Sequence, residues 1–306
     1  MQLGFLTACL PRLELEEIAS WAAANGFDAL EVAAWRRTGD RDFTASHIDA
    51  ASFGPADAEA VRGLFDRHNL TLSSLAFYDN NLHPDPAERK AVNDHVLACI
   101  DAAARLGCPT VGTFVGRHPG RTVAENLRDA EQVFAPLVDR AGERGVKLII
   151  ENCPMEGWHP DGYPGNLAYS PELWEWMFSL GLYLNYDPSH LVWLGIDPVD
   201  AVRPYLDRIP HAQAKDAEVF ADRRTRYSVF GKAVTRDNPW DVGWWRYRVP
   251  GLGSVDWRRL VDAMYEGGFD GVFSIEHEDP VWGGDEARIK LGLEIARRTL
   301  RPLMVA

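Results

Sequence analysis

Short apolar segments alternate with longer amphipathic segments eight times along the chain, and this repetition restricts the fold more than any other feature. Strands of a covered parallel sheet are almost continuously apolar, whereas helices carry apolar residues at helical spacing. The eight expected strands are residues 3–7, 29–33, 70–77, 110–116, 146–152, 182–187, 211–216 and 271–278. The eight expected helices are residues 13–27, 57–70, 86–107, 122–145, 170–181, 197–209, 255–269 and 285–304.

Strands and helices that alternate at these lengths predict a parallel sheet. Eight such units without a Pro-rich or Ser-rich linker favour an α/β fold, a closed (β/α)8 TIM barrel that residues 1–306 form as a single domain. An open dinucleotide-binding sheet is disfavoured because no GxGxxG motif follows the first expected strand.

Two segments interrupt the alternation. Residues 36–52 form a polar loop after the second strand, and residues 221–250 form a long insertion after the seventh. The insertion is too rich in Trp and Tyr for a disordered segment, and long ordered loops are usually functional. We expect it to be a lid over a site or a contact within a homodimer or homotetramer.

Composition narrows the partners. A net charge of −13 disfavours nucleic acid and anionic membranes, which both reward clustered Lys and Arg. The chain shows no leader pattern and no apolar run of transmembrane length. Its four cysteines have no CxxC spacing, so we expect them to be reduced in a cytoplasmic protein. A small molecule or a metal ion is the favoured ligand.

Three carboxylates lie where a barrel of this kind places its functional groups, at the ends of strands. Glu151, Asp187 and Glu276 each follow a strongly apolar strand. Buried carboxylates that converge on one mouth repel each other and lose hydration, and a divalent cation would offset both costs. Oxygen ligands suit Mg²⁺ or Mn²⁺, and an added imidazole favours Mn²⁺, Co²⁺ or Zn²⁺. The alternative is that these acids form ordinary salt bridges with Lys215, Arg248 or backbone amides.

The seventh strand carries His211, Gln213 and Lys215 on one face, because alternate residues of a strand point the same way. That face either lines a site or meets water. His190 follows Asp187 by three residues. It is a candidate to bind a substrate hydroxyl or to orient a ligand, and otherwise a loop histidine bonded to the backbone.

Further aromatic and histidine side chains follow strands. Trp35 and Trp158 are candidates for an apolar wall against a sugar ring, with plain packing as the alternative. His277 faces the other side of its strand from Glu276 and is a poor ligand candidate. Three more histidines lie in loops after strands and are candidates to line a site: His83, His118 and His159.

The motifs at the strand ends resemble a known family. They are IIEN with Glu151, YDPSH with Asp187 and His190, AKD with Lys215, VPGLGSVDW from Val249 to Trp257, and SIEHE with Glu276. This set resembles the xylose isomerase-like TIM barrel superfamily, and within it the sugar phosphate isomerase/epimerase group. That group also includes ketose 3-epimerases, inosose dehydratases and, more distantly, endonuclease IV. The matching motifs span residues 147–279.

The resemblance implies one divalent metal ion (Mn, Mg, Co or Zn) held by Glu151, Asp187, a residue of the seventh strand and Glu276. The family usually has a histidine two residues before the Lys-Asp pair, where this chain has Gln213. A glutamine carbonyl oxygen also ligates Mg²⁺ or Mn²⁺. We therefore expect Gln213 as the fourth ligand, with His211 in reserve.

The implied activity is that of a sugar isomerase or epimerase, which transfers a proton next to a carbonyl through a metal-stabilised enediolate. Glu151 and Glu276 would act as base and acid, and Lys215 would stabilise developing oxyanion charge. Arg248 would hold a polyhydroxylated or anionic substrate, or else form a loop salt bridge. The sequence shows no obvious phosphate cradle, so we expect an unphosphorylated carbohydrate substrate.

Two alternatives remain open. An inosose-type dehydratase would form the same enolate and then expel a β-hydroxyl group. A degenerate barrel, with Gln213 as the mark of lost ligation, would bind without catalysing. An endonuclease is disfavoured, because the chain is acidic where DNA binding needs basic loops.

Overall fold

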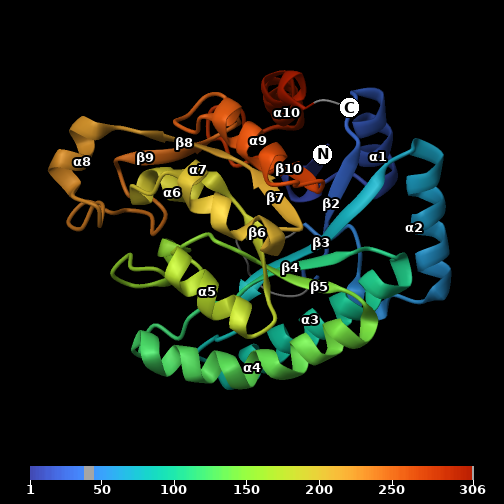
Figure 1. Cartoon of the computed structure of the whole chain (residues 1–306), viewed down its shortest axis with the longest axis horizontal. Coiled ribbons are helices and arrows are strands. Elements are labelled where there is room, and N and C mark those ends of the chain that lie inside the picture. Colours follow the sequence, from blue (N-terminus) through green and yellow to red (C-terminus); the bar gives the residue numbers. More distant parts are fainter. Residues whose placement is uncertain (38–44, 305–306) are drawn as a thin grey trace.

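The computed structural model describes residues 1–37 and 45–304 (Figure 1). Eight parallel strands close into a barrel, each bonded to the next and β10 bonded back to β1. They are β1 (Gln2–Leu6), β2 (Ala29–Ala33), β3 (Thr71–Asn80), β4 (Thr110–Phe114), β5 (Lys147–Glu151), β6 (Tyr183–Tyr186), β7 (His211–Ala214) and β10 (Val272–Ile275). The predicted fold class is confirmed. Residues 38–44 of the expected polar loop lie outside the described residues.

Helices cover the outside of the barrel (Figure 1). They are α1 (Leu15–Ala24), α2 (Pro55–His68), α3 (Pro86–Leu106), α4 (Val123–Arg144), α5 (Pro171–Ser179), α6 (Pro188–Leu194), α7 (Pro198–Val202), α9 (Trp257–Glu266) and α10 (Glu286–Leu300). Short 3-10 turns are Thr7–Cys9, Ala50–Ser52, Glu156–Trp158, Arg203–Arg208 and Arg301–Leu303. Between β6 and β7 the single expected helix is replaced by α6, α7 and the turn Arg203–Arg208.

Local signals fix the ends of these helices. The Asp85 side chain accepts hydrogen bonds from the first turn of α3, and Thr122 with Glu125 forms a capping box at α4. Both helices end at a glycine with positive φ, Gly107 at 70° and Gly145 at 66°. A side chain would strain that left-handed backbone, so the glycines set where each helix stops and the next strand begins.

The insertion after β7 has regular structure of its own. β8 (Asp216–Val219) and β9 (Trp245–Arg248) form an antiparallel ribbon, and α8 (Ala221–Tyr227) lies between them in sequence. The Trp193 ring of α6 stacks on Trp245 with centroids 4.5 Å apart. Trp244 is fully buried in the same apolar cluster. Trp244 and Trp245 therefore pack the insertion against α6.

Asp216 anchors the start of the ribbon. Its carboxylate accepts hydrogen bonds from the backbone N–H groups of Ala217, Gly251 and Val255 and from the Trp257 indole, all at 2.9–3.0 Å. Gly253 passes so close that a Cβ there would lie 2.2 Å from the Asp216 carboxylate. The seventh expected strand, residues 211–216, is thus two strands that belong to different sheets, with Lys215 between them.

The interior of the barrel is polar below its mouth. The Tyr78 hydroxyl donates to Glu31 at 2.5 Å and accepts from the Asn185 amide at 2.6 Å. His211 bonds to Asn185 through Nδ1 at 2.9 Å and to Ser73 through Nε2 at 3.1 Å. These buried groups satisfy one another, which offsets the cost of removing them from water.

No helix in the part of the chain that the structure describes combines the length and apolar character needed to cross a membrane. All four cysteines carry free thiols, as expected: Cys9, Cys99, Cys108 and Cys153.

Candidate functional site

Four charged side chains meet at the mouth of the barrel because parallel strands end at the same edge. Glu151 is the last residue of β5, Asp187 caps α6 directly after β6, Lys215 follows β7, and Glu276 follows β10. The carboxylate oxygens of Glu151, Asp187 and Glu276 lie within 4.8 Å of one another. The structure thus brings together the acids expected from the strand ends.

The Lys215 ammonium lies among these acids. Its Nζ is 2.5 Å from Glu276, 3.3 Å from Asp187 and 4.0 Å from Glu151. A fourth carboxylate, Glu278, lies 3.0 Å from the same nitrogen. One cation therefore faces four acids, and the lysine is 1% exposed.

Burial sets the protonation of these acids. It raises the pKa of Glu276 to about 8, and the Lys215 charge opposes the shift. Burial, followed by the Glu276 charge, also raises the pKa of Glu151 well above its usual value. Burial alone would raise the pKa of Asp187, but His190 and Lys215 lower it to about 2. Neighbouring carboxyl groups thus favour different protonation states, a pattern typical of acid–base sites.

The variant Glu276→Gln is expected to gain stability relative to the metal-free wild type as the pH rises. Burial raises the pKa of Glu276 from 4.5 to about 8, so between these values the folded wild type holds a proton that the unfolded chain has lost. Raising the pH through this window therefore destabilises the wild type, whereas glutamine does not titrate. Urea unfolding across the window measures the difference, and parallel pH profiles would contradict the prediction.

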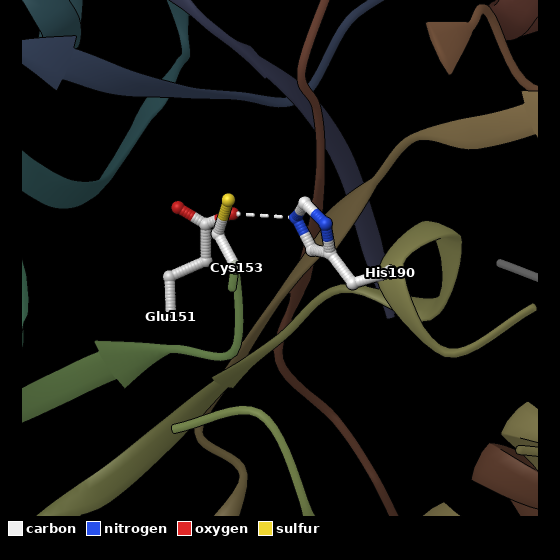
Figure 2. A group of neighbouring side chains, drawn as sticks. All are labelled: Glu151, Cys153 and His190. Atoms are coloured by element: carbon white, nitrogen blue, oxygen red, sulfur yellow. Dashed lines mark hydrogen bonds and ion pairs between the residues drawn. The ribbon is translucent and has the colours of Figure 1, made fainter. Parts of the chain in front are cut away.

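His190 links the acids to the ribbon, and Figure 2 shows its bond to Glu151. Its Nε2 is 3.1 Å from both Glu151 Oε1 and Asp187 Oδ2, and its Nδ1 is 3.2 Å from the Tyr247 hydroxyl. Carboxylates only accept hydrogen bonds, so Nε2 carries the proton and Nδ1 accepts from the tyrosine. Burial lowers the His190 pKa, in keeping with a neutral ring. The histidine therefore holds both carboxylates in place.

Glu151, Cys153 and His190 form a second group with metal-ligand geometry (Figure 2). Metal ligands must be deprotonated. Burial raises the pKa of the Cys153 thiol well above its usual value, and the His190 nitrogen that faces Glu151 carries a proton. Glu151, Asp187 and Glu276 are the better-suited ligand set because all three are carboxyl groups, which a bound cation ionises more readily than a thiol, and because this set does not require the His190 nitrogen to lose its proton.

Gln213 lies below the carboxylates with its amide oriented. Nε2 is 3.4 Å from both Glu31 oxygens and from the Tyr78 hydroxyl. Its Oε1 is buried and has no hydrogen-bond partner among the described residues. A buried oxygen without a hydrogen-bond partner is a favourable ligand for a cation. The excess of carboxyl groups over positive charges at this site also favours binding of a cation. The residues present therefore fit a divalent ion. His211 is less suited as a ligand, because both of its ring nitrogens form hydrogen bonds, one with Asn185 and one with Ser73.

A cavity of about 990 Å³ opens above the carboxylates. Trp35, Trp158 and His83 line it, as does His277, which had been judged a poor ligand candidate. Its wall also includes residues that sequence reasoning did not select: Arg36, Tyr78, Asp79, Phe114, Met155, Trp240, Tyr247 and Glu278. His118 and His159 do not line the cavity.

Arg248 does not line the cavity. Its guanidinium bonds to Asp279 at 2.8 Å and to Glu218 at 2.9 Å. These are the loop salt bridges that were the alternative to substrate binding, and they hold β9 to the segment after β10.

Three residues that contact the candidate site were not predicted to do so from the sequence. Glu278 lies two residues after Glu276, and that spacing was a usable signal for a second carboxylate at the same mouth. Tyr247 reaches His190 from the insertion, and Glu31 reaches Gln213 across the barrel. No local sequence pattern predicts those two contacts, because each joins elements that are distant in sequence.

Two bacterial proteins match the chain to different extents. An uncharacterized protein of Bacillus subtilis, YfiH, is 28% identical over 98% of this chain and 99% of its own length. The inosose dehydratase of Clostridium tetani is 32% identical over 102 residues, which cover 32% of each protein. That second match therefore spans about a third of the dehydratase.

Solved structures share the fold at low sequence identity. A D-psicose 3-epimerase matches 98% of this chain and 99% of its own, with a TM-score of 0.68 and 16% identity. The probable 3-DHS dehydratase AsbF from Bacillus anthracis matches the same shares with the same TM-score and identity. The IOLI protein with a binding zinc atom reaches 0.68 at 19% identity, over 99% of this chain and 96% of its own.

The family model described as xylose isomerase-like TIM barrel matches residues 19–299, which include every strand except β1. The motifs that suggested this resemblance lie inside that range and surround the mouth described above. The chain belongs to the xylose isomerase-like TIM barrel family.

Proposed function

We propose that this chain is a divalent-metal-dependent sugar epimerase or isomerase, which moves a proton at a carbon next to a carbonyl group. The observation that carries the proposal is a pair of buried carboxyl groups, Glu151 and Glu276, which line one cavity and both have a raised pKa. A carboxyl group with a raised pKa is a stronger base and returns its proton near neutral pH.

The metal would be held by Glu151, Asp187, Glu276 and the Gln213 oxygen, for the reasons of charge and unmet hydrogen bonding given above. A bound divalent ion supplies positive charge for the substrate oxygens that become negative on deprotonation. Support comes from the shared fold of the zinc-containing IOLI protein.

Glu151 and Glu276 divide the proton transfer. One carboxylate takes the proton from the carbon, and the other carboxyl group returns a proton to the opposite face for epimerisation. The Lys215 ammonium, 2.5 Å from Glu276, favours the ionised form of that residue and stabilises charge that develops nearby. His190 and Tyr247 fix the position of Glu151 through the bonds described above.

A dehydratase is the second candidate, because inosose dehydratases and AsbF are among the similar proteins. It shares the first step, in which a carboxylate removes the proton next to the carbonyl. Glu276 would act as the acid that delivers a proton to a departing hydroxyl group. The two activities thus differ only in where the second proton goes.

The insertion acts as a lid in this proposal. Trp240 and Tyr247 belong to it and both line the cavity. Trp240 lies against Gly157, where a Cβ would approach its ring to 2.5 Å. These contacts with the cavity support a lid more than a contact between subunits.

Deuterium exchange tests the proposed function. The protein with Mn²⁺ or Mg²⁺ is incubated in D2O with a panel of ketoses, ketose phosphates and inososes, and products are followed by NMR and mass spectrometry. We expect deuterium at the carbon next to the carbonyl of one substrate, and loss of the exchange after chelation. Loss of water with the exchange would identify the dehydratase. Exchange that survives complete removal of metal would contradict the metal dependence.

A further inference from the structure

We propose that the substrate is an uncharged glycoside whose reacting ring carries a keto group away from the glycosidic carbon. The keto sugar sits at Glu151 and Glu276, while a second ring lies against aromatic side chains over β2, β3 and β4. The assignment rests on the proposed function for the reacting end of the molecule. It adds the substrate class, which that function leaves open.

The size of the cavity is the first argument. Its volume of about 990 Å³ is at the upper end of the roughly 300–1,000 Å³ typical for drug-sized ligands. A single hexose is much smaller than such ligands. Glu151, Lys215 and Glu276 occupy only the part of the wall that follows β5, β7 and β10, so a free sugar held there would leave most of the cavity to water.

The second argument is the aromatic wall in the rest of the cavity. Trp35 and Tyr78 have ring centroids 5.9 Å apart, Tyr78 and Phe114 5.2 Å, and Phe114 and Trp158 5.5 Å. These four rings form a continuous row, and Trp240 adds a fifth from the insertion. Neighbouring rings of the row meet at 45–86°, so the wall is an angled apolar surface. Apolar surface of this kind favours another ring, either an aryl group or the C–H face of a sugar.

Charge is the third argument. Acids along the cavity outnumber the Lys and Arg side chains there: Asp79, Glu88, Glu151, Glu276 and Glu278 against Arg36 and Lys215. Arg36 pairs with Glu88 and lies 3.7 Å from Asp79, and Lys215 is held by the catalytic acids. The described wall thus offers a phosphate group no lysine or arginine that is not already paired. An anionic substrate would be repelled, so the ligand is uncharged.

Paired ligands test the assignment. Phenyl β-glycosides of glucose, galactose, mannose and xylose contain no keto group and therefore serve as unreactive binding probes. Each is compared with the parent sugar, and glucose with glucose 6-phosphate, in the Mg²⁺-loaded protein. Binding is followed by calorimetry and by the fluorescence of the cavity tryptophans. We expect at least one phenyl glycoside to bind about tenfold more tightly than its parent, as one aromatic contact provides. Cellobiose, set against phenyl glucoside, shows whether the second ring is a sugar or an aryl group.

Two variants of the insertion localise the effect. Trp240→Ala is expected to reduce the preference for the glycoside over its parent sugar. Phe230→Ala, whose ring is 57% exposed and does not line the cavity, is expected to keep it. Glycosides that bind no better than their parents, or not at all, would overturn the assignment, as would tighter binding of the phosphate. Deuterium exchange into a free ketose is measured separately, so a failure here is distinguishable from a failure of the proposed function.

Discussion

Glu151→Gln is expected to lower kcat by about 10²–10⁴-fold, the usual contribution of a positioned acid or base. Glutamine keeps the shape of the side chain and an oxygen that can accept the His190 hydrogen bond, but it cannot take a proton from carbon. The rate of deuterium exchange into the substrate found in the panel is the measurement. It is made at saturating metal with the bound metal quantified, so that weaker metal binding does not account for the loss.

Glu156→Gln is the matched control. Glu156 lies five residues further on, is 4% exposed and has a pKa that burial raises to about 7. It does not line the cavity, so its amide variant should keep the wild-type rate. Equal losses in the two variants would show that any buried carboxyl group in this loop matters for the fold, and the catalytic assignment of Glu151 would fail.

Lys215→Met is expected to lower the free energy of unfolding of the metal-free protein by about 3–5 kcal/mol, because it leaves buried acids without their cation. Methionine keeps the volume and removes the charge that lies within 4.0 Å of Glu151, Asp187 and Glu276. Denaturant unfolding at about pH 9 makes the comparison above the pKa of about 8 for Glu276 and the pKa of about 2 for Asp187, so that both are ionised in the wild type. Added Mn²⁺ should restore much of the loss, since the ion supplies positive charge to the same carboxylates.

Lys290→Met provides the reference for that measurement. Lys290 of α10 pairs with Glu286 at 2.6 Å, is 24% exposed and lies 5.6 Å from the centre of the Trp21 ring. Such helix pairs contribute about 0.3–0.5 kcal/mol, so its loss should be small. If the two lysine variants unfold alike, and metal stabilises neither beyond the wild type, the ammonium is not compensating the buried acids.

The fold was predictable because hydrophobic spacing is a local property and recurs eight times. The end of one strand and the start of another at Lys215 were not predictable. The chain is extended on both sides of Lys215, and only the strands with which the two sides pair are different. β7 pairs with β10, whereas β8 pairs with β9 beyond the whole insertion. α6 was missed for another reason. Asp187, Pro188 and Gly195 are sound start and stop signals, but its seven residues give too short a helical pattern to recognise.

The candidate site also has a part that local sequence predicts and a part that it does not. Strand ends sufficed to place Glu151, Asp187 and Glu276 at one mouth, since the barrel rule needs no side-chain detail. The contacts of Tyr247 with His190, and of Glu31 with Gln213, depend on how distant strands are packed. The direction of Arg248 depends on its pairing across the ribbon with Asp216 and on Asp279. Roles for these side chains stay predictions until the variants are made.

The four hydrogen bonds to Asp216 allow the insertion to change in sequence while Lys215 keeps its position. They fix the chain at the residue after Lys215, so insertion residues that contact neither Lys215 nor His190 can be exchanged without shifting the ammonium. Tyr247 is not one of these, because its ring lies 4.4 Å from the Lys215 nitrogen and its hydroxyl bonds to His190. Trp240, on the cavity side, lies in that exchangeable part. Natural selection can therefore alter which molecules the cavity admits while the reacting groups keep their positions, and substrate range and chemistry can diverge independently among proteins built on this barrel.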